Sequence, residues 1–176
     1  MSVTVRLDNV NSVLAALKSL GNKEVLVGVP DSNAERSEGP ITSAAIGYIN
    51  ETGSPAQNIP ERPHLVPGVA SVQEETAEQL GIAAKAVLSG DAGKANRALH
   101  KAGKIGRDSV KAKISASDFT PLADSTVAAR ARRGRKGAIA EVKSRKAGNA
   151  PDNSNARPLI DTGEYLKSIT YVVRDD

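Results

Sequence analysis

The chain has 176 residues and a formal net charge of +4, and it contains one Phe, three Tyr, no Trp and no Cys. A length of this order is typical of one domain, and the absence of cysteine excludes a disulfide framework and thiolate chemistry. Because aromatic side chains bury the most area per residue, the core has to be built from Ala, Val, Leu and Ile. We therefore expect one domain over residues 1–176 with a thin core, and such a chain commonly gains stability by associating with copies of itself.

The N-terminal sequence predicts neither export nor a membrane anchor. MSVTVRLDNV lacks a charged region followed by a long apolar run, which a signal peptide has. No stretch of the chain approaches the roughly 20 apolar residues of a membrane span. Alternation of Val3, Val5 and Leu7 with polar residues instead predicts a half-buried strand over 2–8. We expect no membrane partner and synthesis in the cytoplasm.

A helix and a second strand are predicted next. Asn9 or Asn11 is a suitable cap for a helix over 10–20, which ends at Gly21. The run EVLVGVP at 24–30 is rich in β-branched residues, closes on a proline and predicts a strand.

A loop and a short helix follow. Residues 31–40 are polar and predict an exposed loop. Residues 41–53 predict a helix, with Thr42 or Ser43 as its cap and Gly53 as its terminator.

Residues 53–67 contain four prolines, at positions 55, 60, 63 and 67, and the backbone is therefore expected to be rigid. We call these residues the proline-rich segment. Each proline fixes its own φ and pushes the residue before it into an extended conformation, so we expect Ile59 and Arg62 to lie on an ordered ledge. Such a ledge could be a catalytic loop, a metal clamp or a docking surface for another subunit. As a docking surface it would comprise Pro55, Ile59, Pro60, Arg62, Pro63, His64 and Leu65.

Glu51 and Arg62 form our one specific structural hypothesis in this region. Glu51 lies at the end of a predicted helix and Arg62 lies at the beginning of the ledge. The intervening loop is short enough to bring the two side chains together, so we predict a partly buried ion pair that fixes the loop. The alternative to an ion pair is that both side chains are solvated surface charges.

Two long helices follow. A first helix is predicted to start near Pro67 and to run to Leu88, where SGDAG at 89–93 breaks it. A second helix is predicted over 94–114. Its polar side carries a row of basic residues, which we call the basic stripe: Lys94, Arg97, Lys101, Lys104 and Lys111. The basic stripe is either a solvated face or a contact surface for an acidic partner.

The C-terminal third is the most basic part of the chain. A short helix is predicted over 125–133, and residues 134–156, rich in Gly, Lys, Asn and Ser, predict an exposed mobile loop. Thr162 is a suitable cap for a helical turn through Ser168, and alternation at Ile169, Tyr171 and Val173 predicts a final strand. The fold class is therefore α+β: a small, mostly antiparallel sheet with two long helices packed on one face, plus extended loops.

Basic charge is concentrated in residues 130–146, the basic segment. Eight Lys or Arg and one Glu give this segment a net charge of +7, so the remainder of the chain carries −3. We predict a basic arm that orders against an acidic neighbour. Its members are Arg130, Arg132, Arg133, Arg135, Lys136, Lys143, Arg145 and Lys146.

No catalytic constellation is present in the sequence. His64 and His100 are the only histidines, and neither has the neighbouring ligands that a zinc site needs. SGDAGKA at 89–95 lacks both the Gly spacing and the hydroxyl of a phosphate-binding loop, because Leu88 and Ala95 stand at the critical positions. We expect no enzymatic activity, no metal and no cofactor.

Nucleic acid is an alternative partner for the basic residues. Lys and Arg contacts with phosphates would give salt-dependent binding. Because no aromatic residues are interleaved in the basic segment, base stacking is not expected, and no recognition fold such as a helix-turn-helix is visible. Any contact with DNA would be non-specific.

The order of four short motifs resembles the virion-morphogenesis proteins of tailed bacteriophages, a family of small neck, tail-completion and tail-terminator components. The first is Asn50-Glu51-Thr52-Gly53, and the second is IPERP at 59–63. The third is TPLADSTVAARARRG at 120–134, and the fourth is Pro-Leu-Ile-Asp-Thr-Gly at 158–163. Where such proteins commonly carry Phe, this chain has Tyr48-Ile49 and His64, which implies a less aromatic docking surface.

The resemblance implies a non-enzymatic virion protein, assembled in the host cytoplasm, that forms a ring of commonly about six copies at the head–tail junction or the top of the tail. Its expected partners are copies of itself and neighbouring neck, connector or tail-tube proteins. A nucleic-acid-binding accessory protein that uses the basic stripe and the basic segment is the alternative. A tail-tube or sheath-related subunit, which would form open stacks, is a third possibility.

Overall fold

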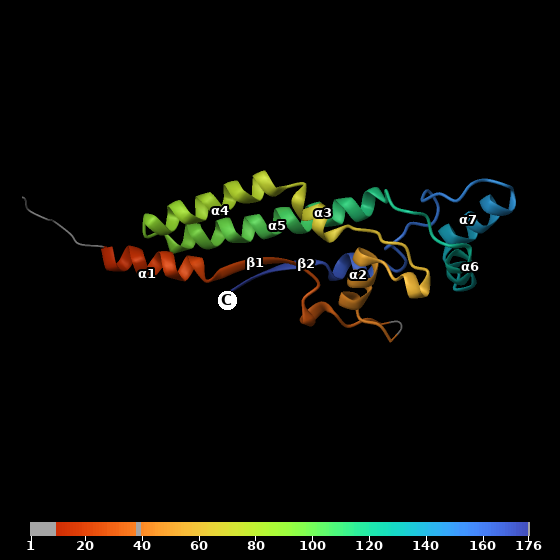
Figure 1. The fold of residues 1–176 in the computed structure, drawn as a ribbon, viewed down its shortest axis with the longest axis horizontal. Helices are drawn as coiled ribbons and strands as arrows, with labels where there is room; N and C mark the ends of the chain where they lie inside the picture. Colours follow the sequence, from red (N-terminus) through yellow and green to blue (C-terminus); the bar gives the residue numbers. More distant parts are fainter. Residues whose placement is uncertain (1–9, 38–39, 176) are drawn as a thin grey trace, which may run out of the picture.

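The computed structural model describes residues 10–37 and 40–175, and within them the fold is α+β, as predicted (Figure 1). Helices dominate, and the sheet has two strands. The elements are α1 (Val10–Gly21), β1 (Lys23–Gly28), α2 (Ser43–Thr52), α3 (Leu65–Ala70), α4 (Gln73–Leu88), α5 (Ala92–Ala116), α6 (Asp124–Arg132), α7 (Lys136–Lys146), α8 (Glu164–Ser168) and β2 (Thr170–Asp175). The strand predicted over 2–8 lies outside the described residues.

The sheet joins two distant parts of the chain. β1 pairs antiparallel with β2, so that Val25 lies opposite Val173. The alternation seen in both sequences places these valines toward the helices, where both pack against the α4–α5 cluster. The predicted antiparallel sheet is therefore confirmed.

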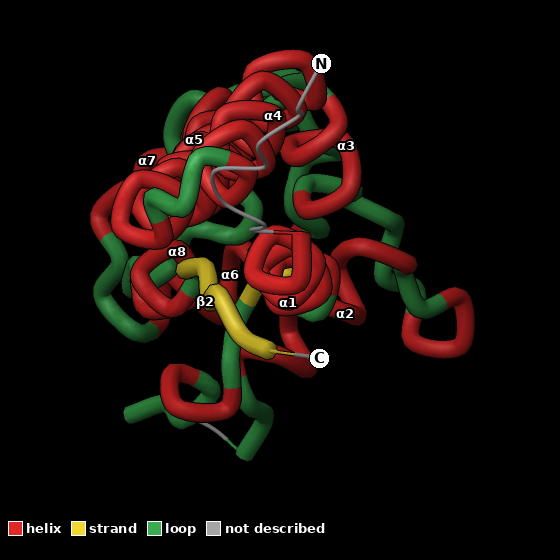
Figure 2. The backbone as a smooth tube through the Cα atoms, turned by 90° about the vertical axis from the view of Figure 1, so that its left-hand side faces the viewer, coloured by secondary structure: helices red, strands yellow, loops and turns green. Residues whose placement is uncertain are grey.

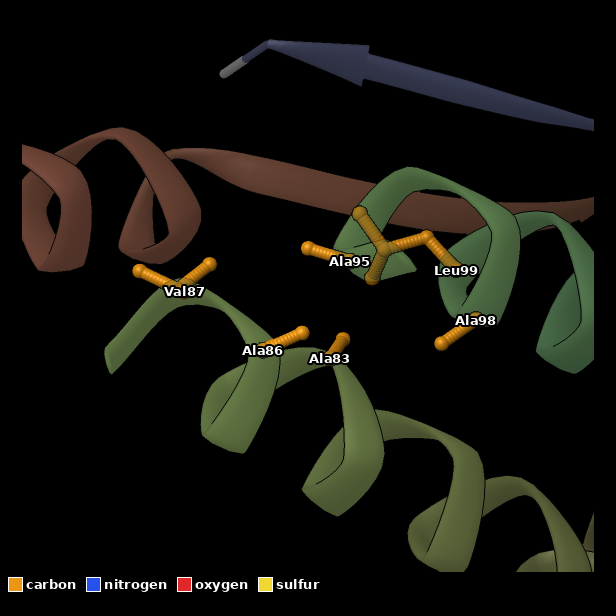
Figure 3. Close-up of a cluster of buried hydrophobic side chains, with 6 residues drawn as sticks. All are labelled: Ala83, Ala86, Val87, Ala95, Ala98 and Leu99. Atoms are coloured by element: carbon orange, nitrogen blue, oxygen red, sulfur yellow. The ribbon is translucent and has the colours of Figure 1, made fainter. Parts of the chain in front are cut away.

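Helices α4 and α5 form an antiparallel hairpin that covers the sheet. The chain reverses at Gly90, whose φ of 75° favours glycine, and the Asp91 side chain caps α5 by accepting a hydrogen bond from the Lys94 backbone N–H at 2.8 Å. Small side chains let the two helices approach closely, and the interface contains Ala83, Ala86, Val87, Ala95, Ala98 and Leu99 (Figure 3). This cluster consists of Ala, Val and Leu, which are among the residue types expected from the composition.

Gly103 marks the point where α5 crosses β2. A Cβ at this position would lie 2.7 Å from Cγ of Tyr171, whose hydroxyl contacts His100 Nδ1 at 3.3 Å. We expect Gly103→Ala to lower the free energy of unfolding by about 1–2 kcal/mol, because overpacking outweighs the gain in helix propensity. In Gly81→Ala, the matched control in α4 with no atom within 4 Å of the added Cβ, stability should rise by up to about 1 kcal/mol. Urea denaturation of both variants measures the difference, and equal effects would contradict the predicted clash.

Two further clusters extend the core toward the other end of the molecule. One contains Val110 and Ile114 of α5 with Tyr165 and Ile169, and it lies beside α3 and α8. The other is the small core between α6 and α7, formed by Leu122, Val127, Ala138 and Ala156. Figure 1 shows the resulting elongated shape, with α1 near one end and α6 and α7 at the other. Viewed along its length, α4 and α5 lie together on one side of the sheet (Figure 2).

One predicted helix needs correction. The helix expected from Pro67 to Leu88 begins at Leu65 and is interrupted at Ser71 and Val72, so α3 and α4 are separate elements. Ser109 explains the interruption in part, because its hydroxyl donates to the Gly68 carbonyl at 2.6 Å and holds α3 against α5.

The exposed mobile loop predicted over 134–156 is wrong. Residues 136–146 form helix α7, and its inner face is buried through Ala138 and Glu141. Polar composition obscured the helix, because its stability comes from tertiary contacts: Glu141 pairs with Arg145 at 2.8 Å and also accepts from the Asn155 side chain.

Candidate docking site around the proline-rich segment

The backbone of the proline-rich segment is fixed by its own hydrogen bonds. Helix α2 is capped by Thr42, whose hydroxyl accepts from the Ala45 N–H, and it ends at Gly53 with φ of 73°, both as predicted. The Ser54 N–H donates to the Ile59 carbonyl at 2.8 Å, which closes a tight turn. The Arg62 N–H then donates to the Asn50 carbonyl at 2.6 Å and ties the segment back to α2.

Glu51 holds the start of α3. Its carboxylate accepts hydrogen bonds from the backbone N–H groups of His64, Leu65 and Val66 at 2.7, 2.9 and 3.0 Å. These N–H groups have no partner within the helix, and an anion is favoured at this end of a helix. Burial raises the pKa of Glu51, but the three donors outweigh burial and bring the pKa below the ordinary value of 4.5.

Arg62 contacts a different part of the chain. Its side chain is buried, and its Nε and Nη2 groups donate to the carbonyl oxygens of Thr120 and Pro121 at 3.0 and 3.3 Å. Burial, together with the nearby positive charge of Arg130, lowers the pKa of Arg62 from its ordinary value. The guanidinium thus ties the proline-rich segment to residues 120–121, which precede α6.

The predicted Glu51–Arg62 ion pair is therefore wrong. Both residues are partly or fully buried, so the alternative of two solvated charges is wrong as well. Each charge is used to bind backbone groups, Glu51 through N–H donors and Arg62 through carbonyl acceptors. Proximity of the two residues along the chain could not distinguish these partners from a direct pair.

His64 connects the contacts of Glu51 to those of Arg62. We call Glu51, Arg62, His64 and Tyr165 together the joint. It is fully buried, and its Nδ1 lies 2.8 Å from the Arg62 carbonyl and 3.1 Å from a Glu51 carboxylate oxygen. A carbonyl and a carboxylate accept only, so Nδ1 carries the proton and Nε2 is the acceptor for the Tyr165 hydroxyl. Burial lowers the pKa of His64 below 6.5 despite the carbonyl and the Glu51 charge, which raise it. Burial and the charge of Glu51 both raise the pKa of Tyr165.

Acid should destabilise the protein through His64. Because the pKa of His64 is lower in the folded protein than the ordinary 6.5, the unfolded chain takes up its proton first as the pH falls. The contribution of neutral His64 to the free energy of unfolding is therefore fully present above pH 6.5. Below that pH it decreases, by at most about 1.4 kcal/mol per pH unit for one proton. Urea denaturation between pH 7.5 and 5.5 measures this slope.

The control for this slope is His64→Gln. It should be less stable at pH 7.5, yet its free energy of unfolding should change less over the same pH range. Glu51 does not disturb the comparison, because its own pKa lies below 4.5. An unchanged slope in the variant would contradict the assignment to His64.

The residues predicted to form a docking surface differ in exposure. Arg62 and His64 are buried and serve the joint, and Ile59 and Leu65 are half-buried. The exposed members are the three prolines, Pro55, Pro60 and Pro63. A partner that docks here would therefore touch the proline rings and leave the buried polar side chains in place.

A cleft of about 850 Å³ lies between the proline-rich segment and α6. Residues of Ile59–Arg62 line one side, and Thr120–Ala123 and Thr126 line the other. Its charged lining consists of Arg36, Glu61, Arg62, Arg130, Arg133 and Asp161, a balance of four positive and two negative charges.

Half of the predicted basic arm is bound within its own chain. Arg133 and Arg135 contact the Asp161 carboxylate at 2.8 and 3.1 Å. Arg130 donates to the Ile160 carbonyl at 3.0 Å, and Arg145 contacts Glu141 at 2.8 Å. The prediction of an arm that orders only against a neighbour is therefore wrong. The other four basic residues are exposed: Arg132, Lys136, Lys143 and Lys146.

In the part of the chain that the structure describes, no group of three or more His, Asp or Glu residues is arranged to hold a metal ion, and no helix has the length and apolar character to cross a membrane. No family model, curated protein or solved structure matches the chain.

Proposed function

We propose that the chain is a structural subunit of a tailed-bacteriophage virion, which forms a ring at the head–tail junction or at the top of the tail. The proposal rests on one observation: the four motifs that resemble this family meet at one joint. The second motif is tied to the first by the Arg62 N–H and the Asn50 carbonyl, and to the third by the Arg62 guanidinium and the Thr120 carbonyl.

The fourth motif joins the same assembly. Asp161 binds Arg133 of the third motif, and Tyr165, which follows the fourth motif, contacts His64 directly after the second. The four motifs, with the residues directly after two of them, are therefore linked by hydrogen bonds and an ion pair, which a chance resemblance gives no reason to expect. A rigid ledge of exposed prolines suits a subunit contact, because little conformational entropy is lost when it docks.

The partners in this proposal are copies of the chain, about six in a closed ring, and neighbouring neck, connector or tail-tube proteins. Electron microscopy of phage particles produced without this protein tests the role. Separate heads and tails would indicate head–tail joining, and overlong tails would indicate termination. Normal infectious particles would contradict the proposal.

A nucleic-acid-binding accessory protein is the second candidate, and an exposed face favours it. On α5, the side chains of Lys94, Arg97, Lys101 and Lys104 are exposed along one side of the helix. Size-exclusion chromatography with light scattering, with and without a phosphate polymer at two salt concentrations, distinguishes the candidates. Oligomers that are insensitive to salt support the ring, whereas a monomer whose only binding is to the polymer and weakens steeply with salt supports the second function.

A further inference from the structure

The cleft between the proline-rich segment and α6 combines an aliphatic wall with a few charged groups. Its volume is about 850 Å³, and its aliphatic lining includes Ile46, Ile59, Leu122 and Leu159. Sites for small organic molecules commonly have volumes of roughly 300–1,000 Å³, a mostly apolar lining and a small number of polar groups that orient the ligand. The lining comes from one chain, so a ligand site here needs no second copy.

Three arginines of this lining keep hydrogen-bond donors that the chain does not use. A guanidinium group has five N–H donors. Within the described residues, Arg62 donates from Nε and Nη2 to carbonyl oxygens, and Arg130 donates to carbonyl oxygens from Nη1. Arg133 donates from Nη2 to the Asp161 carboxylate. Nη1 of Arg62, Nη2 of Arg130 and Nη1 of Arg133 therefore remain for a ligand.

These remaining donors are open to solvent. In the described part of the chain, neither Nη1 of Arg62 nor Nη2 of Arg130 is among the buried polar atoms that lack a partner, and the Arg133 side chain is 53 % exposed. All three residues line the same cleft. A ligand that enters the cleft therefore replaces water at these nitrogens and breaks no hydrogen bond within the chain.

Positive charge beside the cleft is only partly balanced by the chain itself. The Asp161 carboxylate is shared by three arginines, at 2.8 Å from Arg133, 3.1 Å from Arg135 and 3.8 Å from Arg130. Burial and the charge of Arg130 lower the pKa of Arg62. Burial and the charges of Arg133 and Arg135 lower the pKa of Arg130, although Asp161 raises it. The arginines thus lie close enough to repel one another, and an anion between them relieves this repulsion.

The two other charged residues of the lining leave this excess in place. Arg36 lies 3.5 Å from Glu164 and is balanced by it. Glu61 is exposed, so solvent screens its charge more than that of a buried group. A negative charge at this position nevertheless opposes the entry of an anion, which gives a variant whose effect has the opposite sign.

We propose that the cleft is a binding site for a small organic anion, whose carboxylate or phosphate group accepts hydrogen bonds from Arg62, Arg130 and Arg133. Guanidinium groups pair with both kinds of oxyanion through two parallel N–H donors, and such charge-assisted bonds are stronger than neutral ones. The remainder of the ligand lies against the aliphatic wall, at Ile59 and Leu122. The site goes beyond the ring function proposed above and does not depend on it.

Isothermal titration calorimetry of the full-length protein at low salt tests the site, with inorganic phosphate and citrate as separate probes. We expect saturable binding of at least one probe, with a Kd of about 1 mM or lower. Tighter binding of citrate would identify a carboxylate as the preferred group, and tighter binding of phosphate would identify a phosphate. The absence of saturable binding of either probe would overturn the proposal.

Substitution of Arg133 locates the bound probe. Because Arg133 is exposed and Arg135 still holds Asp161, Arg133→Gln should fold normally and weaken binding at least about fivefold. Arg132→Gln, the matched control on α6, removes the same charge outside the lining and should stay within about twofold of the wild type. Glu61→Gln should strengthen binding, by up to about twofold. Equal weakening in the two arginine variants would show that anions gather on the basic surface as a whole, and would overturn the site.

A double variant on α5 separates the cleft from the exposed basic face of that helix. Lys101→Gln/Lys104→Gln should leave the affinity for both probes within about twofold of the wild type. Loss of binding in this variant, with Arg133→Gln unaffected, would place the anion on α5 and overturn the proposal. Light scattering of Arg133→Gln keeps the two proposals distinct, because the site can fail while the oligomeric state of the protein is unchanged.

Discussion

Arg62→Glu is expected to lower the free energy of unfolding by at least about 3 kcal/mol. The substitution places a carboxylate in a buried position next to the carbonyl oxygens of Thr120 and Pro121, which cannot donate a hydrogen bond to it. A buried charge without a partner is among the most costly changes that a protein can undergo. Urea denaturation followed by circular dichroism measures the loss.

Arg132→Glu is the matched control for Arg62→Glu. Arg132 also carries a positive charge but is exposed on α6, so its reversal should change stability by no more than about 0.5 kcal/mol. If Arg62→Glu were as stable as the control, Arg62 would not hold the proline-rich segment against residues 120–121.

Glu51→Leu should cost about 3 kcal/mol. The three backbone N–H groups at the start of α3 would lose their common acceptor, and each unsatisfied donor carries a penalty of roughly 1–3 kcal/mol when water cannot reach it fully. Glu61→Leu, an exposed glutamate in the same segment, is the control and should stay within about 0.5 kcal/mol of the wild type. Equal stability of the two variants would show that the carboxylate is not needed.

A charge swap distinguishes the observed contacts from a direct ion pair. In Glu51→Arg/Arg62→Glu, a direct pair would be rebuilt with opposite polarity and would recover stability. In the observed arrangement an arginine faces N–H donors and a carboxylate faces carbonyl oxygens, so the double variant should be at least as unstable as either single variant. Recovery in the double variant would restore the ion-pair hypothesis.

Local signals in the sequence predicted most of the regular elements. Helix α2 has a threonine cap and a glycine terminator at the expected positions, and the apolar spacing of α5 predicted a helix that the structure extends by two residues at each end. These elements are determined by residues close together in the sequence. The pairing of β1 with β2 was predicted only as a small antiparallel sheet, because partners such as Val25 and Val173 are too distant for local patterns to give their register.

The wrong predictions share one physical cause: the side chains concerned find their partners far away in the sequence. Arg62 finds its acceptors at Thr120 and Pro121, and His64 meets Tyr165, 101 residues away. Helix α7 was missed for the same reason, since its buried side contacts Val127 and Ala156 rather than an apolar stripe of its own. The spacing of Glu141 and Arg145 was a usable signal, because an acidic residue four positions before a basic one supports a helix.

We propose that identical copies of this chain assemble side by side into a closed ring. Light scattering of the purified full-length protein over a wide range of concentrations tests it most directly. The account predicts one discrete species of about six chain masses whose size does not grow with concentration, since a closed ring has no free ends. A monomer throughout the range, or particles that lengthen steadily as the concentration rises, would contradict it.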